Sequence, residues 1–229
     1  MQQLYHQPIS PASRTVRLLL GEKGMAPALI EEKTWEWRED FLRLNPAGEV
    51  PVLVEGPEAE DAVIAGFWPL VEYLEEKYPN PRFLPDDLVA RAEVRRVAEW
   101  FSRKFAAEVS DPLIYEKVTK RFLSVSAGGG GPDMPVVRAA LHNVRYHLDF
   151  ICYLMESRTW LAGERISLAD MVAAAHLSCL DYVGDVPWNQ YEGAKEWYVR
   201  LKSRPAFRTL LADHVPGMPP PRAYANLDF

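Results

Sequence analysis

The chain has 229 residues, of which 48% are hydrophobic and 25% are charged, and its formal net charge is −6. This length is enough for one large or two modest domains with buried cores, and the composition is ordinary for a globular protein. The negative charge argues against general nucleic-acid binding and no apolar run is long enough to span a bilayer, so we expect neither nucleic acid as a partner nor membrane insertion.

The first residues, MQQLYHQPIS, lack the basic segment and the apolar stretch of a secretion signal, so a cytoplasmic location is the default expectation. The two cysteines, Cys152 and Cys179, lie in apolar, helix-like surroundings. We expect both to be buried free thiols rather than disulfide partners. The five histidines show no metal-ligand spacing, and the sequence predicts no metal site.

The first third of the chain alternates between strand-like and helix-like segments. The hydrophobic patterns predict strands at residues 3–6, 28–33, 51–55 and 62–64, helices at 13–23 and from about 67, and a helical turn at 41–45. This order of elements is typical of an α/β domain with a mixed sheet.

Three prolines in the segment YPNPRFLPDD indicate a linker at residues 80–87, and nearly all of the chain beyond it has a helical pattern. Helices are predicted at residues 89–109, at 112–122 after a break, and at 136–158, 167–182 and 193–203. Four consecutive glycines in residues 124–135 predict a mobile loop, because ordering glycine has a high entropic cost. We expect residues 215–229 to form an extended, proline-rich tail.

The helix predicted at residues 167–182 begins with a recognisable capping pattern. Ser167 is followed three residues later by Asp170, close to a capping box in which each side chain satisfies a backbone N–H of the other. Ile166 and Met171 are spaced for a hydrophobic staple. We interpret this segment as a folding element and not as a catalytic one.

The helix predicted from about residue 67 has an unusual start. Helix starts prefer Ser, Thr, Asp or Asn, whose side-chain oxygen accepts a hydrogen bond from a free backbone N–H. Gly66, Phe67 and Trp68 supply no such acceptor, although Pro69 suits a first turn because it has no N–H to leave unpaired. Free N–H groups at a helix start also bind anions, so the two large aromatic side chains at this position require an explanation.

Four segments of the chain together resemble the cytosolic glutathione S-transferase superfamily. They are LYHQPISPASRTVRLLLGEKG, NPAGEVPVLVE, VEYLEEKYP and GERISLADMVAAAHL, and their order is that of the family. The resemblance implies an α/β plus all-α protein: a thioredoxin-like N-terminal domain at residues 1–79 and an all-helical domain at 88–214. It also implies a homodimer, which is the usual state of the family.

The resemblance implies a particular chemistry for the start of the first helix. In the family, a hydroxyl at this place hydrogen-bonds the glutathione sulfur and lowers its pKa, so that the thiolate attacks an electrophile. This role falls on Ser10, with Ser13 as the neighbouring alternative, although Ser10 before a helix is equally a common N-cap. Val50 and Pro51 match the family's cis-proline segment, whose flanking backbone pairs with the glutathione peptide.

Gly66 and Phe67 depart from the family pattern where glutathione is held. The family has Glu-Ser or Asp-Ser here: the carboxylate pairs with the ammonium of the γ-glutamyl end, and the serine binds its α-carboxylate. Gly66 has no side chain and Phe67 has no polar atom. Each lost charged hydrogen bond costs about 1.5–3 kcal/mol, which is roughly tenfold or more in affinity. We therefore expect a degenerate site that binds glutathione weakly or not at all, and no other cofactor.

A more particular resemblance lies outside this pocket. The segments KTWEWREDFLRLNPAGEVPVL, AHLSCLDYVGDVPWNQY, KSRPAFRTLLADHVPGMPPP and YANLDF are similar to a transferase-like family of bacterial cell-division proteins that bind the tubulin-like protein FtsZ. This resemblance implies a division factor that binds FtsZ filaments at the division site. The alternative is a working glutathione transferase that uses Ser10.

The tail and an aromatic pair are the candidate partner contacts. Tyr224, Leu227 and Phe229 supply alternate apolar anchors, and Asp228 adds charge beside them, so we expect the last residues to dock on the body of the protein or on a partner. The composition of residues 218–222 fits docking on a surface and disorder equally well. Trp35 and Trp37 lie on one face of an extended segment; one of them is expected in the core, and Trp37, if exposed, is a candidate hot spot.

Overall fold

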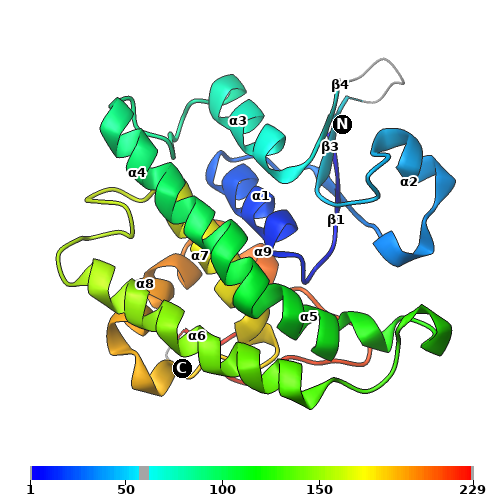
Figure 1. The fold of residues 1–229 in the computed structure, drawn as a ribbon. Coiled ribbons are helices and arrows are strands. Elements are labelled where there is room, and N and C mark those ends of the chain that lie inside the picture. The colour runs from blue at the N-terminus through cyan, green and yellow to red at the C-terminus, as the bar shows by residue number, and fades with distance from the viewer. Residues whose placement is uncertain (1, 57–61, 228–229) are drawn as a thin grey trace.

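The computed structural model describes residues 2–56 and 62–227, and it has an N-terminal α/β part and a C-terminal helical part (Figure 1). In the described residues the sheet has four strands: β1 (Gln3–His6), β2 (Ala28–Glu31), β3 (Val52–Glu55) and β4 (Ala62–Ala65). Their order is β2-β1-β3-β4, with β1 parallel to β2 and antiparallel to β3, and with β3 antiparallel to β4. The predicted mixed sheet is confirmed.

The helices of the α/β part lie on both sides of this sheet. They are α1 (Pro11–Glu22), α2 (Glu39–Leu44) and α3 (Phe67–Lys77), with a short 3-10 turn, η1 (Thr34–Glu36). In Figure 1, α1 and α3 are on one side of the sheet and α2 is on the other. Because its apolar residues face inward, α1 is buried from Ser13 to Leu20 and packs against the C-terminal helices.

The helical part surrounds one buried helix. Its principal elements are α4 (Leu88–Glu99), α5 (Asp111–Lys117), α6 (Met134–Met155), α7 (Leu168–Tyr182), α8 (Glu192–Lys202) and α9 (Arg208–Leu211). Every residue of α7 is buried, and this helix packs against α1 and α4. Within the described ranges, no helix combines the length and the apolar character needed to cross a membrane.

The predicted break before Pro112 is wrong. The chain continues from α4 through a π-helix, η2 (Trp100–Ser110), directly into α5. Pro112 falls in the first turn of α5, where hydrogen bonding changes from the π to the α pattern and a missing N–H is easily accommodated. Helix α5 ends at Lys117, and a 3-10 turn, η3 (Thr119–Arg121), follows it.

The segment before α6 is mostly irregular, with one 3-10 turn at Val125–Ala127. The predicted extended tail is also corrected, because residues 215–227 turn twice. The first turn joins Val215 to Met218 and has Gly217 at φ 71°, and in the second turn the Tyr224 N–H donates to the Pro221 carbonyl. The tail therefore follows the body of the protein instead of extending away from it.

The capping box that opens α7 is present as predicted. The buried carboxylate of Asp170 accepts from the backbone N–H and the hydroxyl of Ser167, at 2.9 and 3.0 Å. It also accepts from the Leu161 N–H and from the Trp197 indole, both at 2.9 Å. Asp170 therefore fixes the start of α7 and ties it to α8 and to the loop before it.

Two groups of buried apolar residues hold the fold together. The larger one is a shared core that runs without interruption from Leu4 in β1 to Leu210 in α9, through α1 and α7. The smaller group, which we call the tail cluster, joins the tail to the β1–α1 loop, α7 and the segment after α5. Its buried members are Ile9, Val118, Cys179, Tyr182, Val215 and Tyr224.

Candidate functional site

The sheet brings the predicted N-terminal site residues to one edge. Strand β1 ends at His6, opposite the start of β3 and beside the end of β2 at Glu31. Strand β4 runs antiparallel to β3, so Ala65 at its end lies opposite Val52. The segments that follow β1, β2 and β4 and the segment that precedes β3 therefore all emerge at this edge, and they carry Ser10, Trp37, Gly66 and Pro51.

Ser10 is the N-cap of α1. Its hydroxyl oxygen accepts a hydrogen bond from the Ser13 N–H at 3.2 Å, which leaves its proton free to be donated elsewhere. Ser13 is fully buried, and its hydroxyl oxygen accepts from the Gln7 N–H at 3.3 Å. Of the two predicted alternatives, Ser10 is therefore the more accessible hydroxyl, and it lies beside the free N–H groups of a helix start.

The cis-proline segment and the start of α3 are in direct contact. The Val50–Pro51 peptide bond is cis, and the Gly66 N–H donates to the Pro51 carbonyl at 3.3 Å. The structure thus brings together three of the four residues predicted at the glutathione end of the site, and Phe67 follows directly as the first residue of α3.

The start of α3 offers no side-chain acceptor to its free N–H groups. Gly66 is its N-cap, with φ 93° and ψ 148°, a conformation that is essentially restricted to glycine. The rings of Phe67 and Trp68 lie 4.9 Å apart, and both side chains are partly buried against the shared core. The two aromatics at this helix start are therefore packing residues, and they supply no polar atom to a γ-glutamyl group except the Trp68 indole N–H.

A cleft of about 310 Å³ opens between this edge of the sheet and the helical part. Its walls are formed by the β1–α1 loop, the segment around Trp35, the end of α5 and the first tail residues. Its apolar lining comprises Ile9, Trp35, Ile114, Val118, Phe122 and Val215. Gln7, Glu31, Lys33 and Glu36 lie among the polar lining residues, so the cleft is apolar with a charged border.

The two tryptophans after β2 have different surroundings. Trp35 stacks on Phe122 with ring centroids 5.3 Å apart, so it connects the two parts of the fold across the cleft. The side chain of Trp37 is 65% exposed, and a Cβ at Gly48 would lie only 3.1 Å from its ring. Trp37 therefore lies over Gly48 with most of its ring exposed to solvent. An aromatic side chain that is exposed in the free protein is available to be buried by a partner, as a binding hot spot must be.

The tail residues do not share one environment. Tyr224 is 1% exposed, and its hydroxyl accepts from Arg14 at 3.1 Å and donates to the Leu210 carbonyl at 3.0 Å. Leu227 is 39% exposed. Asp228 and Phe229, which the sequence also assigns to partner binding, lie outside the described residues. Tyr224 thus anchors the tail to the body of the protein, and only Leu227 is exposed among the described anchors.

Sequence reasoning missed the arginines of α1. Arg14 is fully buried, donates to the Ser178 hydroxyl at 2.8 Å and pairs with Asp213 at 3.3 Å. Arg17 pairs with the same carboxylate at 2.8 Å. A signal was present, because the two arginines lie one turn apart on a helix that continues with the apolar run at residues 18–20, and this pattern indicates a buried ionic contact.

Burial shifts the pKa values of two side chains in this region so that both are uncharged at physiological pH. Burial, reinforced by Arg17, lowers the pKa of His6 to about 4, so this imidazole is neutral at physiological pH. Burial likewise raises the pKa of the Tyr224 phenol to about 12. In the part of the chain that the structure describes, no group of acidic, histidine or cysteine side chains is arranged to hold a metal ion.

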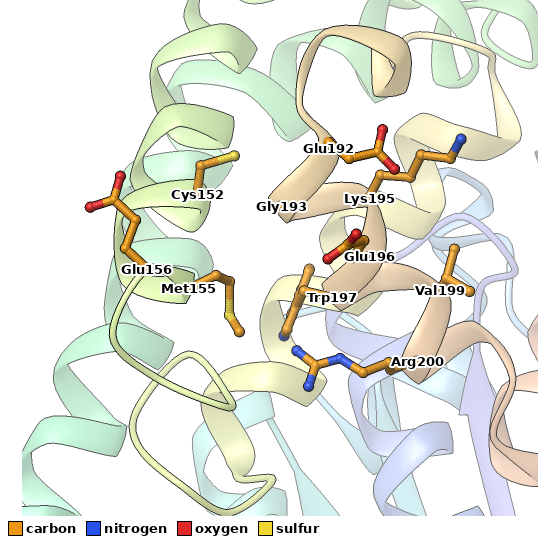
Figure 2. Close-up of a pocket in the computed structure, with 10 residues that line it drawn as sticks. All are labelled: Cys152, Met155, Glu156, Glu192, Gly193, Lys195, Glu196, Trp197, Val199 and Arg200. Atoms are coloured by element: carbon orange, nitrogen blue, oxygen red, sulfur yellow. The ribbon is translucent and has the colours of Figure 1, made fainter.

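A second hollow, of about 680 Å³, lies between α6 and α8 (Figure 2). Cys152 and Met155 face it from α6, and Trp197 and Arg200 line it from α8. Cys152 is half-buried, so the expectation that both thiols are buried holds only for Cys179. This hollow is lined by none of the residues that the sequence assigns to a site, and we do not include it in the candidate site.

Comparisons with known proteins agree with this geometry. The family model of the glutathione S-transferase N-terminal domain matches residues 4–82, and that of the C-terminal domain matches residues 113–205. The chain is 46% identical over 226 residues to FtsZ-localized protein A of Caulobacter vibrioides, covering 99% of this chain and 97% of the relative.

Two solved structures are similar over the whole chain. The structure of FzlA from C. crescentus has a TM-score of 0.94 and 46% identity, covering 100% of this chain and 99% of that one. A structure described as a glutathione S-transferase from Rhodospirillum rubrum F11 has a TM-score of 0.94 and 49% identity, covering all of both chains.

Proposed function

Because the chain belongs to the glutathione S-transferase family, we propose that it is a transferase-like cell-division factor that binds FtsZ and modulates its filaments. Support comes from the similarity to FtsZ-localized protein A, which extends over nearly the whole of both chains. We further propose that it acts in the cytoplasm at the division site.

The observation that favours this proposal over a working transferase is the start of α3. Gly66 and Phe67 stand where the family has an acidic residue and a serine, and neither can form the charged contacts that hold the γ-glutamyl end. Two such contacts are lost, each worth about 1.5–3 kcal/mol. The free N–H groups of α3 still favour a carboxylate, so the proposal is of weak or absent glutathione binding at a degenerate site formed by Val50, Pro51, Gly66 and Phe67.

We propose that the partner surface includes Trp37 and the end of the tail. Trp37 is exposed at the sheet edge, and Leu227 is exposed in the tail. The proposed surface also includes Asp228 and Phe229. An acidic group beside apolar side chains fits a groove on the partner that has a basic rim and an apolar floor. Tyr224 is assigned to anchoring the tail, because its ring and hydroxyl are already occupied within the protein.

The alternative is a glutathione transferase that uses Ser10. Two observations favour it: Ser10 keeps a donatable proton beside a helix start, and Val50–Pro51 has the cis geometry of the family. The similarity to the Rhodospirillum structure, which is described as a transferase, points the same way. Under this alternative, Ser10 would hydrogen-bond the glutathione sulfur, and the apolar cleft would hold the electrophile.

Two measurements on the same preparation separate the functions. Isothermal titration with glutathione is expected to show no binding in the micromolar range, and co-pelleting with FtsZ filaments is expected to show association. Trp37→Ala should reduce co-pelleting, whereas Val125→Ala, which truncates a side chain that is 86% exposed elsewhere, should not. Micromolar glutathione binding without co-pelleting would reject the division role in favour of the transferase.

A further inference from the structure

One buried histidine of α6 contacts two side chains of the π-helix η2. His147 is fully buried, and α6 packs against η2 and α5 along the continuous helix that begins with α4 (Figure 1). The Trp100 indole donates to the Nδ1 atom of His147 at 3.0 Å, and the Nε2 atom lies 3.0 Å from a carboxylate oxygen of Glu108. One imidazole ring therefore connects two positions of η2 that are eight residues apart.

The π form of η2 favours this connection. In an α-helix, residues eight apart are separated by about 12 Å along the axis. A π-helix forms its hydrogen bonds between residues five apart, so each turn holds more residues and the same two positions lie closer together. Because π-helices are rare and frequently occur at functional sites, the contacts that hold η2 in this form are of interest.

The hydrogen-bond partners fix where the proton of His147 lies. An indole N–H can only donate, so Nδ1 accepts, and the single proton of the neutral ring is on Nε2, which donates it to Glu108. Burial lowers the pKa of His147 below its ordinary value of 6.5, although Glu108 opposes this shift, and Lys104 adds to it. The neutral ring is therefore the form present at pH 7.

The other titratable neighbours leave Nδ1 without a second acceptor. Lys104 forms an ion pair with Glu108 on η2 itself, and Tyr146 of α6 meets the imidazole edge-on, with centroids 5.4 Å apart. From α7, the neutral His176 lies beyond the Phe105 ring, which stands edge-on to both imidazoles. In the part of the chain that the structure describes, the one hydrogen bond at Nδ1 is that with the indole.

We propose that His147 is a pH-sensitive clasp on η2. The neutral ring ties Trp100 to Glu108 and stabilises the π form of the segment. Uptake of one proton from solvent at Nδ1 turns this acceptor into a donor, so that two N–H groups face each other. The Trp100 indole must then turn away, whereas the charged ring keeps Glu108 as its partner. The clasp is closed near neutral pH and opens in mild acid.

Opening the clasp changes a partly exposed aromatic surface. The Trp100 ring packs on Phe150 and Tyr146, with centroids 4.2 and 6.0 Å apart, and Tyr146 is 56% exposed. The Lys104 Nζ atom lies 5.6 Å from the Trp100 ring centroid. An indole that turns away loses these contacts, so the shape of the surface depends on one proton. The inference requires neither FtsZ nor glutathione and is independent of the proposed function.

NMR titration of the full chain from about pH 8 to about pH 4 tests the clasp. The imidazole signals of His147 and the indole N–H signal of Trp100, assigned with Trp100→Phe, should move with one common midpoint below pH 6.5. His147→Gln keeps one acceptor and one donor but cannot titrate, so the indole signal should become independent of pH. His142→Gln replaces an exposed histidine of the same helix and, as the matched control, should leave the transition unchanged.

Changes to the two partners should move the His147 midpoint in opposite directions. Glu108→Gln removes the negative charge that favours the imidazolium, so the midpoint should fall. Trp100→Phe removes the donor that occupies Nδ1, so the midpoint should rise by about half to one pH unit. A purely structural role would not produce these opposite shifts. The proposal is overturned if the indole signal does not follow the His147 titration while the protein is folded, or if both variants shift the midpoint in the same direction.

Discussion

At the scale of single residues, the proposal of weak glutathione binding depends on Gly66 and Phe67, and Phe67 offers the simpler test. Phe67→Ser should place a hydroxyl at the first position of α3, beside the free N–H groups that favour a carboxylate. We expect glutathione affinity to rise by about tenfold per contact recovered, measured by titration calorimetry against wild type. Binding by wild type in the ordinary micromolar range would contradict this.

The sequence alone also predicts that the double change Gly66→Glu with Phe67→Ser restores affinity. The structure adds a cost, because Gly66 has φ 93° and ψ 148°, and a side chain there is strained by about 1–3 kcal/mol. The single change Phe67→Ser is therefore the cleaner test, and the melting temperature of the double variant should be measured beside its affinity.

His176 makes stability depend on pH. Its imidazole is buried against the Ser110 hydroxyl, 2.8 Å from Nδ1, and burial lowers its pKa from 6.5 to about 3. The folded protein favours the neutral imidazole, whereas the unfolded chain binds a proton there below about pH 6.5. The stability that neutral His176 contributes is therefore complete above pH 6.5 and is lost as the pH falls toward 3. Each bound proton changes the free energy of unfolding by about 1.4 kcal/mol per pH unit in that window.

Denaturant titrations at several pH values check this directly. His176→Gln removes the titrating group and should reduce the fall in unfolding free energy between pH 6.5 and 4, relative to wild type. His142→Gln is a suitable comparison, since it replaces a histidine elsewhere in the chain. Equal pH slopes for wild type and His176→Gln would show that other groups dominate.

Some residue roles follow from sequence and others do not. Ser10 before a helix predicts an N-cap, because that role depends only on neighbouring backbone. The buried position of Arg14 depends on Ser178, Asp213 and Tyr224, whose separations from it in sequence reach 210 positions. No local pattern fixes which distant groups neutralise a buried charge.

At the scale of elements, local signals predicted the strands and most helices to within a few residues. The start of α7 is the clearest success, because the capping box is a property of four adjacent residues. The false break at Pro112 has the opposite cause: proline locally favours a helix boundary, whereas η2 and α5 pack against α6 and α7 as one continuous helical segment. Tertiary contacts therefore outweighed one local signal.

Asp170 is expected to be the most sensitive position of the α7 start. Asp170→Ala leaves the Leu161 N–H, the Ser167 N–H and the Trp197 indole without their acceptor in a buried region. Each unsatisfied buried group costs about 1–3 kcal/mol, so we expect a loss of several kcal/mol in denaturant unfolding. Asp170→Asn keeps one acceptor oxygen and should lose less; equal losses would count against this account.

The end of the tail should contribute to binding more than to stability. Deleting residues 226–229 leaves Tyr224 and its contacts in place, so the melting temperature should stay close to that of wild type. FtsZ co-pelleting should fall for this deletion and for Asp228→Lys. Unchanged co-pelleting in both variants would remove the tail end from the partner surface, and a large drop in melting temperature would give it a structural role instead.

At the scale of the whole molecule, we expect a homodimer in which the N-terminal domain of one subunit contacts the C-terminal domain of the other. Two-fold symmetry would present two partner sites per particle, which suits crosslinking of filaments through avidity. Light scattering at micromolar concentration should give twice the monomer mass. A monomer under these conditions would contradict the expected geometry and the bundling that it supports.

Whole-chain architecture was predictable because four segments in a fixed order resemble one family. We retain the division into residues 1–79, 80–87, 88–214 and 215–229 as a proposal for domain boundaries. Composition indicated that the tail was unusual, but its turns and its fastening to α7 depend on the surface that the folded body presents. The cleft that the first tail residues help to form could not be predicted for the same reason.

The shared core has a consequence for the synthesis of the protein. Helix α1 is buried largely by α7, and Arg14 and its partner Ser178 are 164 positions apart in the chain. At about 5–20 residues per second, the ribosome needs roughly 10–30 s to cross that interval of 164 positions. During this time the face of α1 that α7 covers in the folded protein stays exposed, so we expect the nascent N-terminal part to be prone to aggregation until α7 is made.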